Sequence, residues 1–406
     1  MLKALKNGVK GGRWYSLMDK LYRVKLLKSS FYKVKANKGA AGVDHVTVSH
    51  YEENLEDNLE ELSADLKEGN YKPQPVKREY IPKPGKDEKR PLGIPTVRDR
   101  IVQTALKDLL EPIFEQEFAD NSFGFRPNRG AKDALRKLQD LLNEGYTYVV
   151  DADILSYFDN IPHDLLMREV EKQVTDNGIL SLIRSFLKAK IMEGTDRWSP
   201  EGGTPQGAVV SPLLANIYLN PLDHLMKDKG YKLIRYADDF VVLCKTKEKA
   251  RKALKVINDW VKQAGLSLHP KKTKLVDATR YGFDFLGYHF ERGYRWPRKK
   301  SGQKLKDSIR EKTPRTYGNS LEKCISEINA TLEGWFEYFK HSRPRTFSNL
   351  DGWIRMRLRS ILRQRAGREG RGRGRDHQRW PNSYFQKRGL FSLVEAYRRE
   401  LESSKR

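Results

Sequence analysis

Two adjacent acids between two short apolar runs constrain the fold of this chain most. Residues 233–236 and 240–243 have the length of strands, and only Ala237, Asp238 and Asp239 separate them, which is the spacing of a β-hairpin. An isolated Asp-Asp pair is usually explained by the preference of Asp for turns. Here the flanking runs are apolar enough for burial, and adjacent carboxylates are costly to desolvate unless a cation compensates. The pattern predicts a hairpin that presents acids to a cation.

The surrounding pattern predicts an α/β body for this hairpin. Residues 146–154 are predicted to form a buried strand and residues from 165 onward a helix, and a helix ending near Gly265 follows the hairpin. The succession of strand, helix, hairpin and helix suits a split βαβ arrangement, in which an antiparallel sheet carries helices on one face. The free face can then receive a substrate, as in the palm of a polymerase.

A third acid completes the set. Asp153 stands at the end of the strand predicted for residues 146–154. Magnesium prefers hard carboxylate oxygens and takes further ligands from water and phosphates, so two or three aspartates can hold a pair of ions. Two divalent ions about 4 Å apart neutralise both the attacking oxygen and the leaving pyrophosphate in nucleotidyl transfer. Asp153, Asp238 and Asp239 fit this chemistry, with Mg²⁺ as the expected metal and Mn²⁺ as an alternative.

Charge and composition favour a nucleic-acid partner. The chain has 406 residues, with 78 Lys and Arg against 53 Asp and Glu, a net charge of +25. No stretch approaches the roughly 20 apolar residues of a spanning helix, and the start lacks the features of a signal peptide, so we expect a cytoplasmic, bacterial protein without membrane contact. Cys244 and Cys324 are too few for a zinc knuckle or a disulfide framework and are predicted core residues.

Several motifs in order resemble those of the reverse transcriptases encoded by group II introns. The resemblance runs from about residue 30 to the end and is carried first by residues 153–159 (DILSYFD), 203–216 (GTPQGAVVSPLLAN) and 236–239 (YADD). It implies a right-hand polymerase of the α+β class, with fingers and palm around a split βαβ antiparallel sheet, then an all-helical thumb and a short basic C-terminal domain. Ala208 departs from the family pattern, where a second glycine is more usual.

The resemblance also implies domain bounds and catalytic roles. The expected domains are an N-terminal extension (1–60), fingers and palm (61–292), thumb or maturase domain (293–365) and a C-terminal DNA-binding segment (366–406). It makes Asp153 and Asp238 the principal metal ligands and Asp239 a supporting one, whereas Asp151 matches no required ligand. Phe158 falls where the family places a ring beneath the incoming sugar, which would exclude a 2′-hydroxyl and select deoxynucleoside triphosphates.

Further motifs imply contacts with nucleotide, template and primer. Residues 81–85 (IPKPG) and 89–96 (KRPLGIPT) resemble the fingertip hairpin, which makes Lys83 and Arg90 candidates for the triphosphate, and Gln206 and Gly207 would line the nucleotide pocket. A solvated basic loop is the alternative for Lys83. Residues 123–127 (FGFRP) suggest Arg126 for a template phosphate. Residues 281–288 (YGFDFLGY) resemble the primer grip, which includes Gly287, although they could equally be a plain strand.

The last third of the chain resembles the thumb and a DNA-binding segment. The matching stretches are residues 334–339 (GWFEYF), 353–359 (WIRMRLR), 380–385 (WPNSYF) and 389–393 (GLFSL). Arg355 and Arg359 are the arginines expected to contact nucleic acid, and the glycine- and arginine-rich residues 368–375 are expected to form a mobile basic loop. No second nuclease domain with His and Cys clusters follows, so we expect a form that lacks the endonuclease, similar to class C, without second-strand cleavage.

Three interpretations follow from these motifs. The first is an RNA-directed DNA polymerase that copies an RNA template from a DNA or RNA primer, binds group II intron RNA to assist splicing, and supports mobility into target DNA. The second is a maturase that only binds RNA, which the intact acids disfavour. The third is a domesticated reverse transcriptase that serves repair, phage defence or spacer acquisition with the same chemistry.

Overall fold

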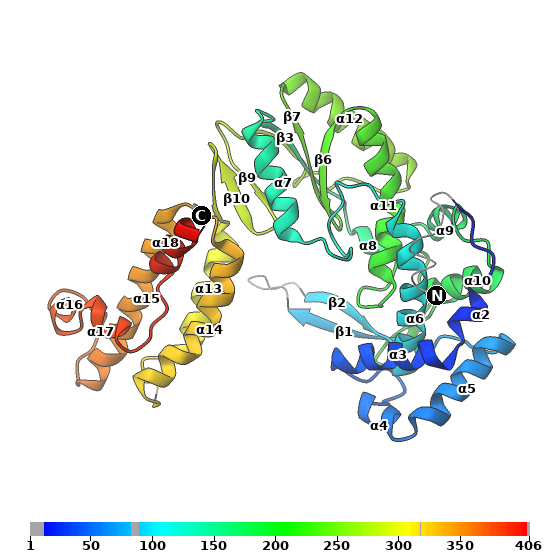
Figure 1. The fold of residues 1–406 in the computed structure, drawn as a ribbon, viewed down its shortest axis with the longest axis horizontal. Coiled ribbons are helices and arrows are strands. Elements are labelled where there is room, and N and C mark those ends of the chain that lie inside the picture. Colours follow the sequence, from blue (N-terminus) through cyan, green and yellow to red (C-terminus); the bar gives the residue numbers. More distant parts are fainter. Residues whose placement is uncertain (1–11, 83–88, 317, 404–406) are drawn as a thin grey trace. The chain divides into compact units, whose positions relative to one another are not determined.

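The structure, a computed structural model, describes residues 12–82, 89–316 and 318–403 (Figure 1). The chain divides into two compact units, Met1–Leu275 and Val276–Arg406. Each unit contains a buried apolar cluster of its own, formed by residues between 17 and 266 in the first and between 305 and 396 in the second. The units are therefore described one at a time.

The first unit begins with helices that surround a long buried helix. Their bounds are α2 (Met18–Leu21), α3 (Val24–Ala36), α4 (Val48–Glu53), α5 (Leu55–Glu68) and α6 (Val97–Glu115). The glycine-rich loop between α3 and α4 approaches the start of α6 closely: a Cβ added to Gly42 would lie 2.7 Å from the Cα of Thr96. The backbone of this loop therefore packs directly against the N-cap residue of α6.

A small sheet forms the fingers. Strand β1 (Val76–Pro82) pairs antiparallel with β2 (Lys89–Ile94), and the sheet continues through β4 (Ile191–Glu193) to β5 (Asp196–Trp198) in the order β2-β1-β4-β5. The predicted fingertip residue Lys83 lies outside the described residues, whereas Arg90 lies on β2 opposite Ile81. The hairpin predicted for residues 81–96 is therefore confirmed on both of its described strands.

A second sheet, with the strand order β6-β7-β3-β8, carries the three acids. Its strands are β3 (Tyr148–Asp153), β6 (Lys232–Tyr236), β7 (Asp239–Cys244) and β8 (Lys274–Asp277). The helices of this region are α7 (Ala131–Asn143), α8 (Tyr157–Asn160), α9 (His163–Glu171), α10 (Asn177–Leu187), α11 (Ser211–Asp228) and α12 (Lys247–Gln263). Helix α12 packs against β3 and β7, while α7 and α11 contact β6 (Figure 1). This arrangement confirms the predicted antiparallel sheet with helices packed on it.

The hairpin differs in one detail from its prediction. Tyr236 pairs with Asp239, so the turn contains only Ala237 and Asp238, and Asp239 is the first residue of β7. The two acids are therefore held differently: Asp238 by a tight turn, and Asp239 by a strand ladder.

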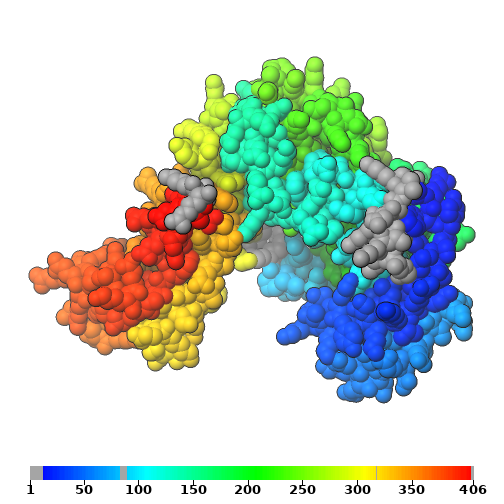
Figure 2. All heavy atoms as spheres, in the orientation of Figure 1, coloured from blue at the N-terminus to red at the C-terminus, as the bar shows by residue number. Residues whose placement is uncertain are grey.

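The second unit starts with strands and continues with helices. Its elements are β9 (Phe283–Phe285), β10 (Tyr288–Glu291), β11 (Tyr294–Pro297), α13 (Lys299–Lys312), α14 (Leu321–Phe339), α15 (Pro344–Arg365), α16 (Asp376–Arg379), α17 (Asn382–Gln386) and α18 (Leu393–Ser403). Strand β11, which pairs with β10, lies at the start of the stretch predicted to be an all-helical thumb. The helices of this stretch therefore begin only at Lys299. The helices that follow form one continuous body, coloured from yellow to red in Figure 2. Within the described ranges, no helix has the length and apolar character needed to cross a membrane.

Candidate active site

The three predicted acids come together at one end of the β3–β7–β6 sheet. Asp153, the last residue of β3, is the direct partner of Asp239 on β7, and Asp238 precedes it in the turn. Asp239 is exposed, and Asp153 and Asp238 are half-buried. Asp153 and Asp239 are thus neighbours, although 239 − 153 = 86 positions separate them in the sequence, because β3 ends opposite the first residue of β7.

The electrostatics of this group call for a cation. Burial raises the pKa of Asp238 above its ordinary value and the charge of Asp153 raises it further, whereas Arg90 and Arg235 act to lower it. A divalent ion would remove this cost, and carboxylate oxygens are the ligands that Mg²⁺ prefers. Among the described side chains, no three or more of His, Cys, Asp and Glu are grouped closely enough to hold a metal by themselves. The carboxylates fit an ion that takes its remaining ligands from phosphates and water.

Lys272 is a neighbour of the acids that the sequence did not reveal. Its Nζ lies 3.0 Å from Oδ2 of Asp153, and the Asp153 carbonyl accepts a backbone hydrogen bond from His269, 2.7 Å long. The loop after α12 therefore returns to the end of β3 and adds a positive charge beside the acids. The sequence alone did not indicate this contact, because the two residues lie 119 positions apart.

The fingers hairpin and the residue 203–207 loop meet by backbone contact. The Gly93 N–H donates to the Gln206 carbonyl, and a Cβ on Gly207 would lie 2.3 Å from the Gly93 carbonyl oxygen. Gly207 also has a φ of +108°, in the left-handed region that favours glycine. This contact joins β2, the strand of Arg90, to the loop of Gln206.

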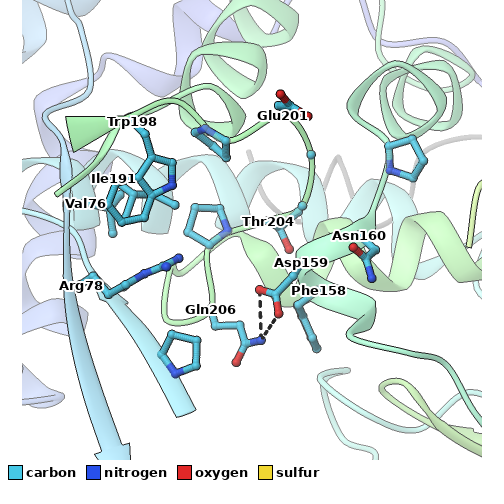
Figure 3. A pocket seen from close by; sticks show the side chains of 17 residues that line it. Val76, Arg78, Phe158, Asp159, Asn160, Ile191, Trp198, Glu201, Thr204 and Gln206 are labelled. Atoms are coloured by element: carbon cyan, nitrogen blue, oxygen red, sulfur yellow. Dashed lines mark hydrogen bonds between the residues drawn. The ribbon is translucent and has the colours of Figure 1, made fainter. Parts of the chain in front are cut away.

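Gln206 and Phe158 line a cavity of about 650 Å³ between the fingers sheet and this loop (Figure 3). The Gln206 amide donates to both carboxylate oxygens of Asp159 at 3.3 Å, and the two side chains point toward each other in Figure 3. The half-buried Phe158 ring lies edge-on to Tyr157 and Phe125. Phe125 is 47% exposed, whereas Phe123 is buried.

Arg126 lies where a template phosphate cannot reach it. Its side chain is 2% exposed, pairs with Glu115, and donates to the carbonyls of Ala119 and Ser122 at 2.6 and 2.8 Å. The prediction that Arg126 binds the template is corrected, because its donors hold the 119–126 loop together. A sequence motif does not distinguish a buried arginine from an exposed one.

The thumb arginines are also engaged within their own unit. Arg359 is 2% exposed and donates to the Trp380 carbonyl at 2.9 Å and to Asn382 Oδ1 at 2.8 Å, so its predicted contact with nucleic acid is corrected as well. Arg355 is partly exposed and lies 3.6 Å from Asp351. Both arginines lie on α15, and Arg359 joins that helix to the segment that follows residue 375.

Gly287 lies in the turn between β9 and β10, at a φ of +85°. Its carbonyl accepts hydrogen bonds from the Arg298 N–H and the Ser301 hydroxyl, at 2.9 and 3.0 Å. The neighbouring Leu286 carbonyl accepts one from Tyr338 on α14. The turn is thus bound to the helices of the second unit, and its predicted contact with a primer stays a prediction.

Comparison with known families agrees with these features. A model of the reverse transcriptase (RNA-dependent DNA polymerase) family matches residues 81–290, and a model of the group II intron maturase-specific domain matches residues 302–380. The first match contains all three acids, and the second falls entirely within the second unit.

Curated relatives carry the same relationship. Protein YkfC of Escherichia coli (strain K12) is 34% identical over 342 residues, which cover 73% of this chain and 88% of YkfC. The group II intron-encoded protein LtrA of Lactococcus lactis subsp. cremoris is 39% identical over 225 residues, which cover 54% of this chain but only 37% of LtrA. Among solved structures, telomerase from Candida albicans has 12% identity and a TM-score of 0.45, covering 82% of this chain and 67% of that chain.

Proposed function

The chain belongs to the reverse transcriptase family and carries a group II intron maturase domain, and from this premise we propose that it is an RNA-directed DNA polymerase. One observation carries the proposal: Asp153 and Asp239 are partners on adjacent strands, with Asp238 in the turn between β6 and β7. A maturase that only binds RNA has no need of this costly group of charges.

In the proposed reaction, the 3′-hydroxyl of a primer attacks the α-phosphate of a deoxynucleoside triphosphate and releases pyrophosphate. Asp153 and Asp238 would hold two Mg²⁺ ions with Asp239 in support, and the ions would supply charge neutralisation at the attacking and leaving oxygens. Arg90, on β2 of the fingers hairpin, would contact the triphosphate. Phe158 excludes a 2′-hydroxyl, and Gln206 and Gly207 position the new base pair. Lys83 stays a candidate for the triphosphate.

We also propose that this chain binds the nucleic-acid partners expected for its family. The maturase-domain match supports binding of a group II intron RNA to assist splicing, and the net charge of +25 suits RNA, a primer–template duplex and target DNA. Intron mobility belongs to the same proposal. Relatives from Escherichia coli and Lactococcus lactis support a bacterial origin, and a cytoplasmic location is part of the same proposal.

Primer extension on an RNA template with Mg²⁺ tests the polymerase. The native chain is compared with Asp238→Asn, which removes the charge at nearly constant size, and with Asp151→Asn as the matched control on the same strand. We expect deoxynucleotide incorporation by the native chain and the control, and a loss of at least about a thousandfold in Asp238→Asn. Tight RNA binding without extension by the native chain would contradict the enzyme and leave the RNA-binding maturase.

A splicing assay separates the intron maturase from a domesticated enzyme. Active primer extension together with protein-dependent splicing of an intron RNA from the same genomic neighbourhood supports the maturase role. Active extension without an effect on splicing supports the domesticated form, which would serve repair or phage defence.

A further inference from the structure

Arg235 is a fully buried arginine directly beneath the turn that carries Asp238. It is the fourth residue of β6, and both its side chain and that of Asp223 are 0% exposed. Its Nε donates to the two carboxylate oxygens of Asp223 at 2.9 and 3.1 Å, and Nη1 donates to the Ala237 carbonyl at 3.0 Å. One guanidinium thus connects a buried carboxylate to the backbone of the turn.

Helix α11 provides the anchor for this guanidinium. Asn216 and Asp223 are seven residues apart, two turns of the helix, so both face β6. Asn216 accepts from Nη1 of Arg235 at 2.8 Å, and its own amide donates to the Gly124 carbonyl at 2.8 Å. The forked, planar guanidinium can reach Asp223, Asn216 and Ala237 together, which a lysine cannot do.

Gly124 makes a second contact with the turn, through its backbone. A Cβ on Gly124 would lie 2.2 Å from the backbone nitrogen of Ala237, so the 119–126 loop lies directly against the turn. Phe123 N–H donates to the Arg235 carbonyl at 2.8 Å, and Arg235 N–H donates to the Asn121 carbonyl at 2.9 Å. The turn is therefore held by a carbonyl contact to Arg235 and by backbone contact with Gly124.

The turn needs such support because of its conformation. Ala237 has a φ of +59°, which costs free energy for a residue with a Cβ and persists where the surroundings impose it. Asp238 follows directly, so a change at Ala237 would move its carboxylate. Two charged groups and an amide, those of Arg235, Asp223 and Asn216, are buried here. A buried charge network is retained at a cost in desolvation, which points to a role in fixing geometry.

We propose that Arg235 is a positioning residue: with Asp223 and Asn216 it holds the Ala237 carbonyl, and so fixes where the Asp238 carboxylate meets a divalent ion. The inference rests on the proposed polymerase function. It follows that the affinity of the site for a divalent ion depends on Arg235, although Arg235 does not contact the ion.

The test removes the guanidinium without leaving a buried carboxylate unpaired. The double variant Arg235→Met with Asp223→Leu does this, and Arg235→Lys keeps the charge with fewer donors. Gly124→Ala pushes on the turn from its other side while Arg235 stays intact. Leu222→Ala, next to Asp223 and fully buried, is the matched control that lowers stability without touching the turn.

Four quantities are measured below the lowest Tm of the set. They are the Mn²⁺ dissociation constant, by electron paramagnetic resonance on the protein with a primer–template duplex, the half-saturating Mg²⁺ concentration of extension, the kcat of extension, and the duplex Kd. We expect the double variant and Gly124→Ala to bind Mn²⁺ about tenfold more weakly and to lose about a hundredfold in kcat, with duplex Kd within about twofold. Arg235→Lys should recover part of the loss.

Leu222→Ala should lower Tm and leave the Mn²⁺ dissociation constant unchanged. Native Mn²⁺ affinity in a folded double variant would overturn the positioning role. If the double variant does not fold, Arg235→Lys decides, and native Mn²⁺ affinity in that variant would overturn the role as well. Because Mn²⁺ binding is measured without nucleotide, an inactive native chain would contradict the proposed polymerase but leave the Arg235 result readable.

Discussion

At the scale of single residues, Lys272 places a positive charge beside Asp153, one of the expected metal ligands. Its ammonium lies 3.0 Å from Asp153 Oδ2, on an oxygen that a metal ion would also use. Both side chains are partly exposed, so the pair is weak and a divalent ion can displace it. The ion pair therefore lowers the apparent metal affinity by a small factor.

We predict that Lys272→Met lowers the half-saturating Mg²⁺ concentration of primer extension by about two- to fivefold, since no ammonium then competes for Asp153. A Mg²⁺ titration of the extension rate measures this. Lys271→Met is the control, because the exposed side chain of Lys271 forms no ion pair with Asp153 in the part of the chain that the structure describes. A higher Mg²⁺ requirement in Lys272→Met would show that the ammonium assists the reaction instead.

Phe158 makes a second prediction at this scale. Phe158→Ala should reduce the preference for deoxynucleotides over ribonucleotides by at least about tenfold, because the ring no longer excludes a 2′-hydroxyl. The ratio of kcat/KM for dCTP and CTP measures it. Phe125→Ala, whose ring centre lies 6.5 Å from that of Phe158, should have a smaller effect. An unchanged ratio in Phe158→Ala would remove the sugar-gate role.

At the scale of elements, the backbone contact between β2 and the 203–207 loop depends on two glycines. Any side chain at Gly207 would meet the Gly93 carbonyl oxygen and would also be strained at a φ of +108°. The loop that carries Gln206 would then have to leave β2. The nucleotide end of the site is thus assembled by the close approach of two backbones.

Gly207→Ala should therefore raise the KM for deoxynucleotides by about tenfold or more, since Gln206 is displaced. Gly194→Ala is the matched control: it also has a positive φ, +59°, but a Cβ there meets nothing within 4 Å. We expect the control to lose at most about 1 kcal/mol of stability and to keep its KM. Steady-state extension at varied nucleotide concentration decides, and equal effects of both substitutions would contradict the contact.

At the scale of the whole molecule, one buried cysteine reports on each unit. Cys244 ends β7 in the first unit and Cys324 lies on α14 in the second, and both are buried as the sequence predicted. Burial raises the pKa of each thiol to about 11, so both stay protonated at neutral pH. The thiolate is the reactive form, and it becomes common in the folded chain only as pH approaches 11.

We predict that the native chain at pH 8 reacts with iodoacetamide at least about a hundredfold more slowly than the unfolded chain. In a urea series, Cys244 and Cys324 should become reactive at different concentrations, because each belongs to a separate apolar cluster. Mass spectrometry of the labelled peptides measures both rates. Simultaneous exposure of the two thiols would show that the chain unfolds as one cooperative unit.

The sequence by itself determined the acidic hairpin and the order of elements around it. Apolar runs flanking Asp238 and Asp239, and the strand that ends at Asp153, are local patterns, and alternation and spacing are sufficient to identify them. The glycine requirement at Gly207 also appeared in sequence as a motif, although its reason did not.

Only the tertiary structure decided which charged side chains face solvent. Arg126 and Arg359 look like nucleic-acid contacts in sequence, yet both are buried. Arg126 pairs with Glu115 and donates to carbonyls of its own loop, and Arg359 donates to the Trp380 carbonyl and to Asn382. Lys272 and Arg235 carry no motif signal, and they gained their places beside Asp153 and beneath Ala237 when remote segments packed together. Burial and pairing depend on how the segments pack together, and a local pattern contains no information about that packing.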